Sequence, residues 1–157
     1  MVRLVSMTES EFQIYLKQSI ADYAREHVQA GNWDAADALH KAELEFRQLL
    51  PDGVSSKHQH LFSLEESDTG AKIGLIWFAE KSQASHPSAF IYDFLIHEEY
   101  RRKGYGRQAL LAVEEKVKEL GVETIALHVF AHNQAAIELY QKTGYKITDI
   151  HMAKKLS

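Results

Sequence analysis

The stretch AFIYDFLIHEEYRRKGYGRQALLAVEEKV, residues 89–117, carries the strongest structural signal in the sequence. Its first part, Ala89–Ile96, is mostly apolar and rich in aromatic and β-branched residues, as is typical of a strand. A charged segment then leads to two glycines, Gly104 and Gly106. Apolar residues recur at helical spacing from Gly106 to Leu120, and Gly121 is placed to end that helix. The stretch therefore predicts a strand, a loop and a helix in direct succession.

The residues after this stretch continue the succession of elements. Thr124–Phe130 alternates in polarity and is predicted as a strand. A crossover helix joins it to Ala89–Ile96, so the two strands are expected to be parallel neighbours. Asn133 is predicted to cap a helix that reaches Thr143, and a last strand is predicted over Tyr145–Ala153.

The chain begins with a short predicted strand, Val2–Val5. Thr8 and Glu11 then form a Thr-x-x-Glu capping box, and apolar residues at helical spacing predict a helix that runs to about Gln29. Gly31 follows as the stop signal of this first helix.

A second helix and a hairpin are predicted next. The helix runs from around Asp34 to the stop at 51–53, a Pro-Asp-Gly sequence. His60–Glu65 and Ala71–Lys81 are predicted as an antiparallel pair, and the second is apolar enough to be a central strand. The whole predicts an α/β protein in which a central mixed β-sheet is flanked by helices on both faces, in a single domain over residues 1–157.

Composition narrows the function classes. The chain has 157 residues, a net charge of −4 and no cysteine, which excludes disulfides, thiol nucleophiles and cysteine-based zinc sites. The net negative charge disfavours nucleic acid and anionic membranes as partners. The longest apolar run, Ile73–Ala79, is far shorter than the roughly 20 residues of a membrane-spanning helix, and the first residues do not resemble a signal peptide. We therefore expect a cytoplasmic protein.

The loop between strand and helix is a candidate phosphate site. Glycines permit close backbone approach, and the first turn of a helix offers free N–H groups. Four cationic side chains surround it: Arg101, Arg102, Lys103 and Arg107. The alternative is a solvated basic turn. Although Gly104-x-Gly106-x-x-Ala109 satisfies the dinucleotide fingerprint, a charged stretch separates it from its strand and the next strand ends without an acid, so a Rossmann site is disfavoured.

These residues resemble the GNAT superfamily of acetyl-CoA-dependent N-acetyltransferases. Its central motif, Gln/Arg-x-x-Gly-x-Gly/Ala, is matched at residues 101–106, after an apolar strand end at 91–96. Its downstream motif is similar to LHVFAHN at 127–133 followed by LYQKTGY at 139–145. The resemblance covers residues 89–145 and implies a GNAT-like fold and acetyl-CoA as co-substrate.

The resemblance also implies the site residues. Backbone N–H groups of the loop would hold the coenzyme A pyrophosphate, with Arg101, Arg102, Lys103, Gly104, Tyr105, Gly106 and Arg107 as its members. The main chain of Leu95 and Ile96 would pair with the pantetheine arm. Asn133 would contact the pantetheine, cap its helix, or do both. Tyr140 matches the family's tyrosine that protonates the leaving thiolate, although core packing is its other interpretation.

The general base is not fixed by the sequence. Strand alternation predicts that Phe90, Tyr92 and Phe94 share one face of their strand and that Asp93 lies on the other. Members of the resembled family tend to carry an acidic or basic group of this strand on the Phe90/Tyr92 face, so the resemblance implies that Asp93 is a structural acid rather than the base. Glu80 and a water chain are the alternatives.

Other features bear on the acceptor side and on metals. His58 and His60 are weak candidates for lining the acceptor cleft, as are three aromatic residues of the first two helices, Tyr15, Tyr23 and Trp33. No metal is expected, because no third ligand stands at a recognisable spacing from the histidines. The acceptor would be a small-molecule or peptide amine, and the protein a monomer or homodimer. A non-catalytic acyl-CoA-binding module on the same fold is the alternative function.

Overall fold

The structure is a computed structural model, and it describes residues 1–81 and 86–157. Along the chain the elements are β1 (Val2–Ser6), α1 (Glu9–Gln29), α2 (Ala38–Leu49), β2 (Gln59–Glu66), β3 (Lys72–Lys81), β4 (Ser88–Ile96), α3 (Tyr105–Glu119), β5 (Thr124–Leu127) and α4 (Gln134–Lys142). Two single 3₁₀ turns, Gly53–Ser55 and Glu98–Tyr100, complete the described part.

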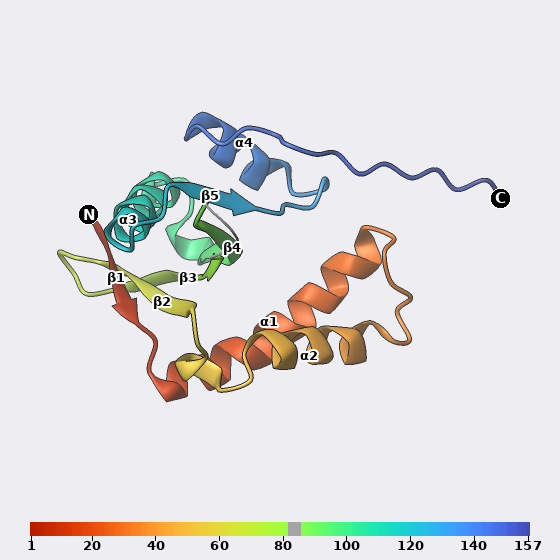
Figure 1. The fold of residues 1–157 in the computed structure, drawn as a ribbon, viewed down its shortest axis with the longest axis horizontal. Coiled ribbons are helices and arrows are strands. Elements are labelled where there is room, and N and C mark those ends of the chain that lie inside the picture. The colour runs from red at the N-terminus through yellow and green to blue at the C-terminus, as the bar shows by residue number, and fades with distance from the viewer. Residues whose placement is uncertain (82–85) are drawn as a thin grey trace.

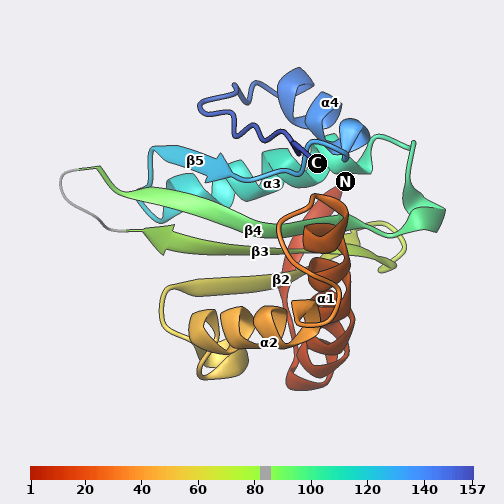
Figure 2. The same cartoon turned by 90° about the vertical axis from the view of Figure 1, so that its right-hand side faces the viewer.

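The strands form one mixed sheet between two helical layers (Figures 1 and 2). Their order is β1-β2-β3-β4-β5, antiparallel at every pairing except the parallel pair β4–β5. α1 and α2 cover one face, where Phe12, Phe46 and Trp77 are buried, and α3 covers the other. The predicted mixed sheet with helices on both faces is confirmed.

α1 begins where the sequence predicted it. The Thr8 side chain accepts from the Glu11 N–H at 3.1 Å, and the Glu11 carboxylate accepts from the Thr8 N–H at 3.0 Å, so both halves of the capping box are present. Small residues, Ala24 on α1 with Ala38 and Ala42 on α2, are buried where the two helices meet. α1 is thereby held across the face of the sheet that carries Trp77.

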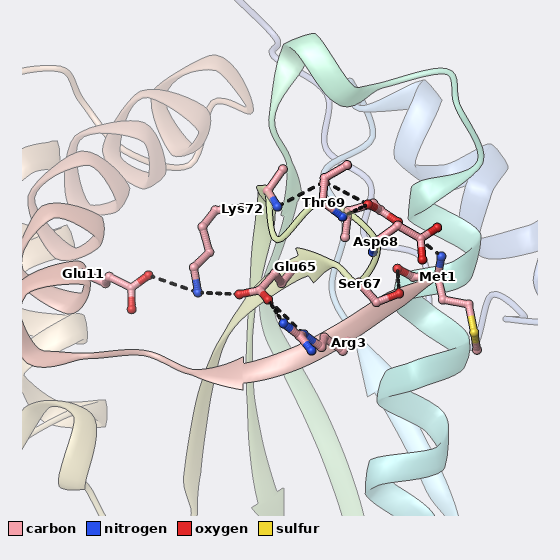
Figure 3. Close-up of polar contacts among 10 residues, drawn as sticks. Met1, Arg3, Glu11, Glu65, Ser67, Asp68, Thr69 and Lys72 are labelled. Carbon is pink, nitrogen blue, oxygen red and sulfur yellow. Dashed lines mark hydrogen bonds and ion pairs between the residues drawn. The ribbon is translucent and has the colours of Figure 1, made fainter.

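Polar contacts beside the β2–β3 turn connect the start of α1 to the strands (Figure 3). The Lys72 ammonium lies 3.0 Å from the Glu65 carboxylate and 3.8 Å from that of Glu11. Glu65 also binds the Arg3 guanidinium on β1. The network joins β1, the β2–β3 hairpin and the start of α1. It therefore fixes the helix that carries Tyr15.

A β-bulge in β4 overturns the predicted alternation of that strand. Phe78 is paired with Ile91 and Trp77 with Asp93, so Tyr92 is one residue too many for its partner strand. Tyr92 stacks on Trp77 at 4.6 Å, on the side of α1 and α2. Asp93 lies on that side too, because its carboxylate accepts a hydrogen bond from Tyr15 on α1. Phe94 instead packs on the α3 side, near Tyr140. The prediction that placed Asp93 opposite Tyr92 was therefore wrong.

The other differences concern the ends of elements. α3 begins at Tyr105 rather than Gly106, and β5 ends at Leu127 rather than Phe130, because β4 and β5 diverge beyond the Ile91–Leu127 pair. The strand predicted over Tyr145–Ala153 is wrong for this chain by itself. That segment is extended but unpaired, and it leads away from the body of the molecule (Figure 1). No helix in the described part of the chain combines the length and the apolarity needed to cross a bilayer.

Candidate functional site

A cavity of about 800 Å³ lies between α1, the sheet and the segment after β5. α1 and α2 contribute one wall, and β3 and β4 form its floor. Of the residues that the resemblance assigned to the coenzyme A site and to catalysis, Leu95, Asn133 and Tyr140 line it. The cavity thus lies beside the diverging strands and extends under the helices that precede the sheet.

The end of β4 is free on one side because β5 turns away. The parallel pairing covers only Ser88–Ile91 with Thr124–Leu127. Beyond it, among the described residues, β4 is paired only with β3, through Leu95 to Leu75 and Ile96 to Gly74. The carbonyl oxygen of Ile96 is engaged, since it accepts a hydrogen bond from Nε of Arg101 at 2.8 Å. An extended ligand arm can therefore pair with β4 near Leu95, whereas Arg101 secures the loop to the strand end.

The loop after β4 presents a run of free backbone donors. Within the described residues, the N–H groups from Arg102 to Arg107 donate no hydrogen bond to the protein. Arg102 and Gly104 have positive φ, 63° and 82°, and Gly104 stands immediately before α3. Such alternation of backbone conformation, followed by a helix start, gathers N–H groups around an anion.

The side chains of this loop favour an anion as well. Those of Arg101, Arg102, Lys103 and Arg107 are exposed, and within 1–81 and 86–157 none of them has an ion-pair partner. Lys103 lies 6.0 Å from the Tyr100 ring centre, and Tyr105 packs on the edge of the same ring. These residues lie outside the lining of the cavity, beyond the free end of β4.

Two glycines act through close packing. A β-carbon on Gly106 would lie 2.9 Å from Cδ2 of Leu139, so this glycine lets α4 approach the start of α3. A β-carbon on Gly74 would collide with the carbonyl oxygen of Leu95. Sequence reasoning missed Gly74, although a glycine inside an apolar strand signals a close backbone approach.

Asp93 is the carboxylate that the bulge brings to the cavity. Its Oδ2 accepts a hydrogen bond of 2.8 Å from the Tyr15 hydroxyl. Burial raises the pKa of Asp93 to about 6, and the negative charges of Glu26 and Asp22 push it the same way, whereas the Tyr15 hydrogen bond lowers it. A carboxylate with that pKa is ionised at neutral pH and accepts a proton more readily than an ordinary aspartate.

Tyr140 reaches the cavity from α4. Its ring lies 6.3 Å from that of Phe94 and 5.7 Å from that of Tyr145. Burial raises the pKa of Tyr140 well above its usual value, and the negative charge of Asp93 adds to the shift. The phenol therefore keeps its proton at physiological pH. Asn133, at the start of α4, accepts a hydrogen bond from the Ala136 N–H at 3.3 Å, which confirms it as a helix cap.

Carboxylates dominate the part of the cavity formed by the helices. Asp22 and Glu26 on α1 and Glu45 on α2 line it together with Asp93. Burial raises the pKa of Glu26, and the Tyr23 hydroxyl donates to Glu45 at 2.7 Å. Among the described residues, Glu26, Glu45 and Asp93 have no ion-pair partner. The lysine on the wall, Lys72, is bound to Glu11 and Glu65.

The remaining candidates lie elsewhere. Nε2 of His60 is 2.6 Å from the carboxylate of Glu80, and the His60 ring stacks on Phe78, so this pair faces away from the cavity. His58 and Trp33 do not line the cavity either, whereas Tyr15 and Tyr23 do. No group of three or more potential ligands that could hold a metal ion occurs in the described part of the chain.

Comparison with known proteins identifies the family of this chain. The chain matches the model of the acetyltransferase (GNAT) family over residues 16–145. It is 41% identical to the uncharacterized N-acetyltransferase YycN of Bacillus subtilis strain 168, over 99% of this chain and 99% of YycN. It is 37% identical to the uncharacterized N-acetyltransferase YdgE of the same strain, over 98% of this chain and 97% of YdgE.

Solved structures extend the likeness to the fold. The crystal structure of the putative acetyltransferase YycN from Bacillus subtilis superposes with a TM-score of 0.95 at 40% identity, over 100% of this chain and 99% of that one. A putative acetyl transferase from Pyrococcus furiosus shares the fold at 22% identity, with a TM-score of 0.70 over 99% of this chain and all of that one.

The raised pKa of Asp93 gives a stability prediction. In the unfolded chain Asp93 titrates near its ordinary value of about 4, so the penalty for its burial as a charge is fully present above pH 6 and absent below about pH 4. Asp93→Asn removes this penalty. We expect the variant to gain unfolding free energy on the order of 1–3 kcal/mol at pH 8, with the gain disappearing as the pH falls to 4. Urea denaturation across this range measures it, with the exposed Asp149→Asn as control. A pH-independent difference would mean that Asp93 titrates normally.

Proposed function

Since the chain belongs to the acetyltransferase (GNAT) family, we propose that it moves an acetyl group from acetyl-CoA to a primary amine of a small molecule or peptide, by direct attack in a ternary complex. One observation carries the proposal. Asp93 and Tyr140, a carboxylate suited to accept a proton and a phenol that retains one, line the same cavity at the free end of β4.

The donor half of the site suits coenzyme A. The free N–H groups of residues 102–107 and the exposed cations around them would hold the pyrophosphate. The main chain near Leu95 would pair with the pantetheine as an added strand. The side-chain oxygen of Asn133 already caps α4, which leaves its amide nitrogen to contact the pantetheine.

Asp93 would serve as the general base. The attacking amine reacts only when neutral, and its nitrogen must lose a proton as the bond to the thioester carbon forms. Asp93 accepts that proton, and Tyr15 orients the carboxylate by donating to Oδ2. Glu80, which the His60 ring binds outside the cavity, is poorly placed for this role.

The thioester oxygen and the sulfur need donors of their own. A main-chain N–H near Leu95 would stabilise the negative charge that develops on the oxygen. As the carbon–sulfur bond breaks, Tyr140 donates its proton to the sulfur, so that the products are an amide and a free thiol. Proton exchange with water through the open cavity would then restore Asp93 and Tyr140.

The charges of the cavity favour an acceptor with more than one positive charge. One amine would stand unprotonated at Asp93, while a second, protonated amine would lie near Glu26 and Glu45, which have no ion-pair partner among the described residues. Aromatic rings beside them, Tyr23 and Phe130, offer faces for a cation. A diamine or longer polyamine has this pattern of charges.

The cytoplasmic location and the single-domain organisation stay predictions.

Replacing Gly104 tests the donor site. Gly104 and Gly121 stand at opposite ends of α3, both have φ near 80°, and neither has an atom within 4 Å of an added β-carbon. We expect Gly104→Val and Gly121→Val to lose similar stability, because a valine is strained at the positive φ of either position. Only Gly104→Val should lose the rise in melting temperature with acetyl-CoA, since its side chain would occupy the pyrophosphate position. Equal ligand stabilisation in both variants would place the diphosphate elsewhere.

Replacing Tyr140 tests the acid and separates an enzyme from a mere acyl-CoA-binding module. Tyr140→Phe should keep acetyl-CoA affinity and lower kcat by about 10²–10⁴-fold, the usual range for loss of an acid–base group. Tyr145→Phe, at the neighbouring ring, should change kcat little. Release of free thiol in the presence of an amine panel measures both. Unchanged turnover in Tyr140→Phe excludes the proton-donor role, and the absence of thiol release from the unaltered protein with every amine would favour the binding module.

Replacing the acceptor-side carboxylates tests the second charge. The double variant Glu26→Gln with Glu45→Gln should raise KM for a diamine by about 10-fold or more, since each hydrogen bond to a charged group contributes roughly 1.5–3 kcal/mol. KM for a monoamine of equal length should change much less. Glu138→Gln, on the exposed face of α4, is the control. An equal effect on both amines would show that these carboxylates do not read a second charge.

A further inference from the structure

The segment after α4 leaves an unusual amount of apolar surface in water. Residues 146–157, the tail, are all exposed. Ile147, Ile150, Met152 and Leu156 are 61%, 71%, 86% and 87% exposed. The tail is extended and leads away from the domain (Figure 1). Its sequence was predicted as a strand, and a strand with such side chains requires a partner.

A groove of about 600 Å³ lies where that partner would be. One wall is β5 with the residues after it, 124–129, and the opposite wall is the start of the tail, 146–149. α4 and the end of α3 form its base, through Ile137, Tyr140 and Val117. Residues 146–149 of the chain's own tail form a wall and do not fill this groove, and the rest of the tail leads away from the domain (Figure 1).

The elements around the groove are incompletely covered. β5 is the last strand of the sheet, and within the described residues nothing pairs with its outer edge. Ile125, Leu127 and Val129 are only half-buried. α4 has no fully buried residue, although its sequence places Ala136, Ile137 and Tyr140 on one face. A strand beside β5 would cover all of these side chains and satisfy the free backbone groups of the edge.

We propose that the tail of a second copy of this chain occupies the groove. The two tails would then lie side by side between the two β5 strands, in the order β5, partner tail, own tail, partner β5. A two-fold axis between the tails makes this arrangement closed, since each tail fills the groove of the other chain. Each tail becomes a central strand, paired on both edges, and the two sheets become continuous.

The partner's tail would also complete the active site. Leu127, His128, Val129 and Tyr140 line both the groove and the cavity of the proposed site. A strand in the groove therefore supports Tyr140 and closes the side of the cavity that faces the diverging strands. The dimer itself does not depend on the proposed chemistry, and its test requires no substrate.

Proline substitution tests the pairing. In the proposed dimer the tail uses its backbone groups on both edges, so Thr148→Pro removes a needed N–H and should yield monomers. Thr148→Ala, which keeps the N–H, should remain dimeric. Light scattering after size-exclusion chromatography should give twice the 17.9 kDa chain mass for the unaltered protein and for Thr148→Ala. Circular dichroism would show that Thr148→Pro remains folded. A monomeric unaltered protein up to about 100 µM, or a Thr148→Pro variant that stays dimeric, would overturn the proposal.

Disulfide trapping identifies the strand that pairs with β5. The chain has no cysteine, so introduced thiols can react only with each other. One version carries Ala126→Cys on β5, and a differently tagged version carries a tail cysteine at 146, 148 or 150. Mild oxidation of the mixture should give a crosslinked heterodimer for at least one tail position. Lys17→Cys in place of Ala126→Cys should give none, because Lys17 is exposed on α1 and lies outside the groove. A double variant that forms only an internal disulfide, with monomer mass at every concentration, would show that the tail folds back on its own β5.

Discussion

The extra residue in β4 is the constraint on which the site depends. Because Tyr92 has no partner of its own on β3, the strand twists between Ile91 and Asp93, and the pairing with β5 ends at the same point. The bulge turns the Asp93 carboxylate under α1 and leaves the main chain that follows open on its other edge. Regular alternation would have turned Asp93 to the α3 side. The bulge thus lies where the two halves of the proposed site meet, the free edge of β4 for the donor and the Asp93 carboxylate for the acceptor.

The two halves of the site are built by different means. The donor half consists of main chain: the free edge of β4, the loop, and the first turn of α3. The acceptor half consists of side chains from α1 and α2, which pack on the sheet through Phe12, Phe46 and Trp77. Lys72 and its two carboxylates fasten the start of α1 to the hairpin (Figure 3). Under the proposed function, main chain would recognise a group that every coenzyme A ester shares, whereas side chains would discriminate among amines.

Local sequence signals predicted most of the fold. The Thr8–Glu11 capping box located the start of α1, and the run of residues 89–117 located β4, the loop and α3, because both are determined within a few neighbouring residues. The bulge could not be predicted, since it depends on how β3 and β4 pair, and this error placed Asp93 on the wrong face. The last strand failed for a related reason. Its apolar pattern is present, but a strand exists only where another strand lies beside it.

Gly74 has a consequence for how such a protein can change. No side chain fits between β3 and the Leu95 carbonyl, so this junction tolerates neither a larger residue nor a shift of one strand against the other. By contrast, side chains line the α1 part of the cavity, among them Ile14, Gln18 and Asp22, and Ile14 is 75% exposed. Under the proposed function, a new acceptor would require substitutions on α1 and α2 alone. Specialisation toward different amines could then proceed on one wall while the proposed acyl-delivery machinery on the other is left untouched.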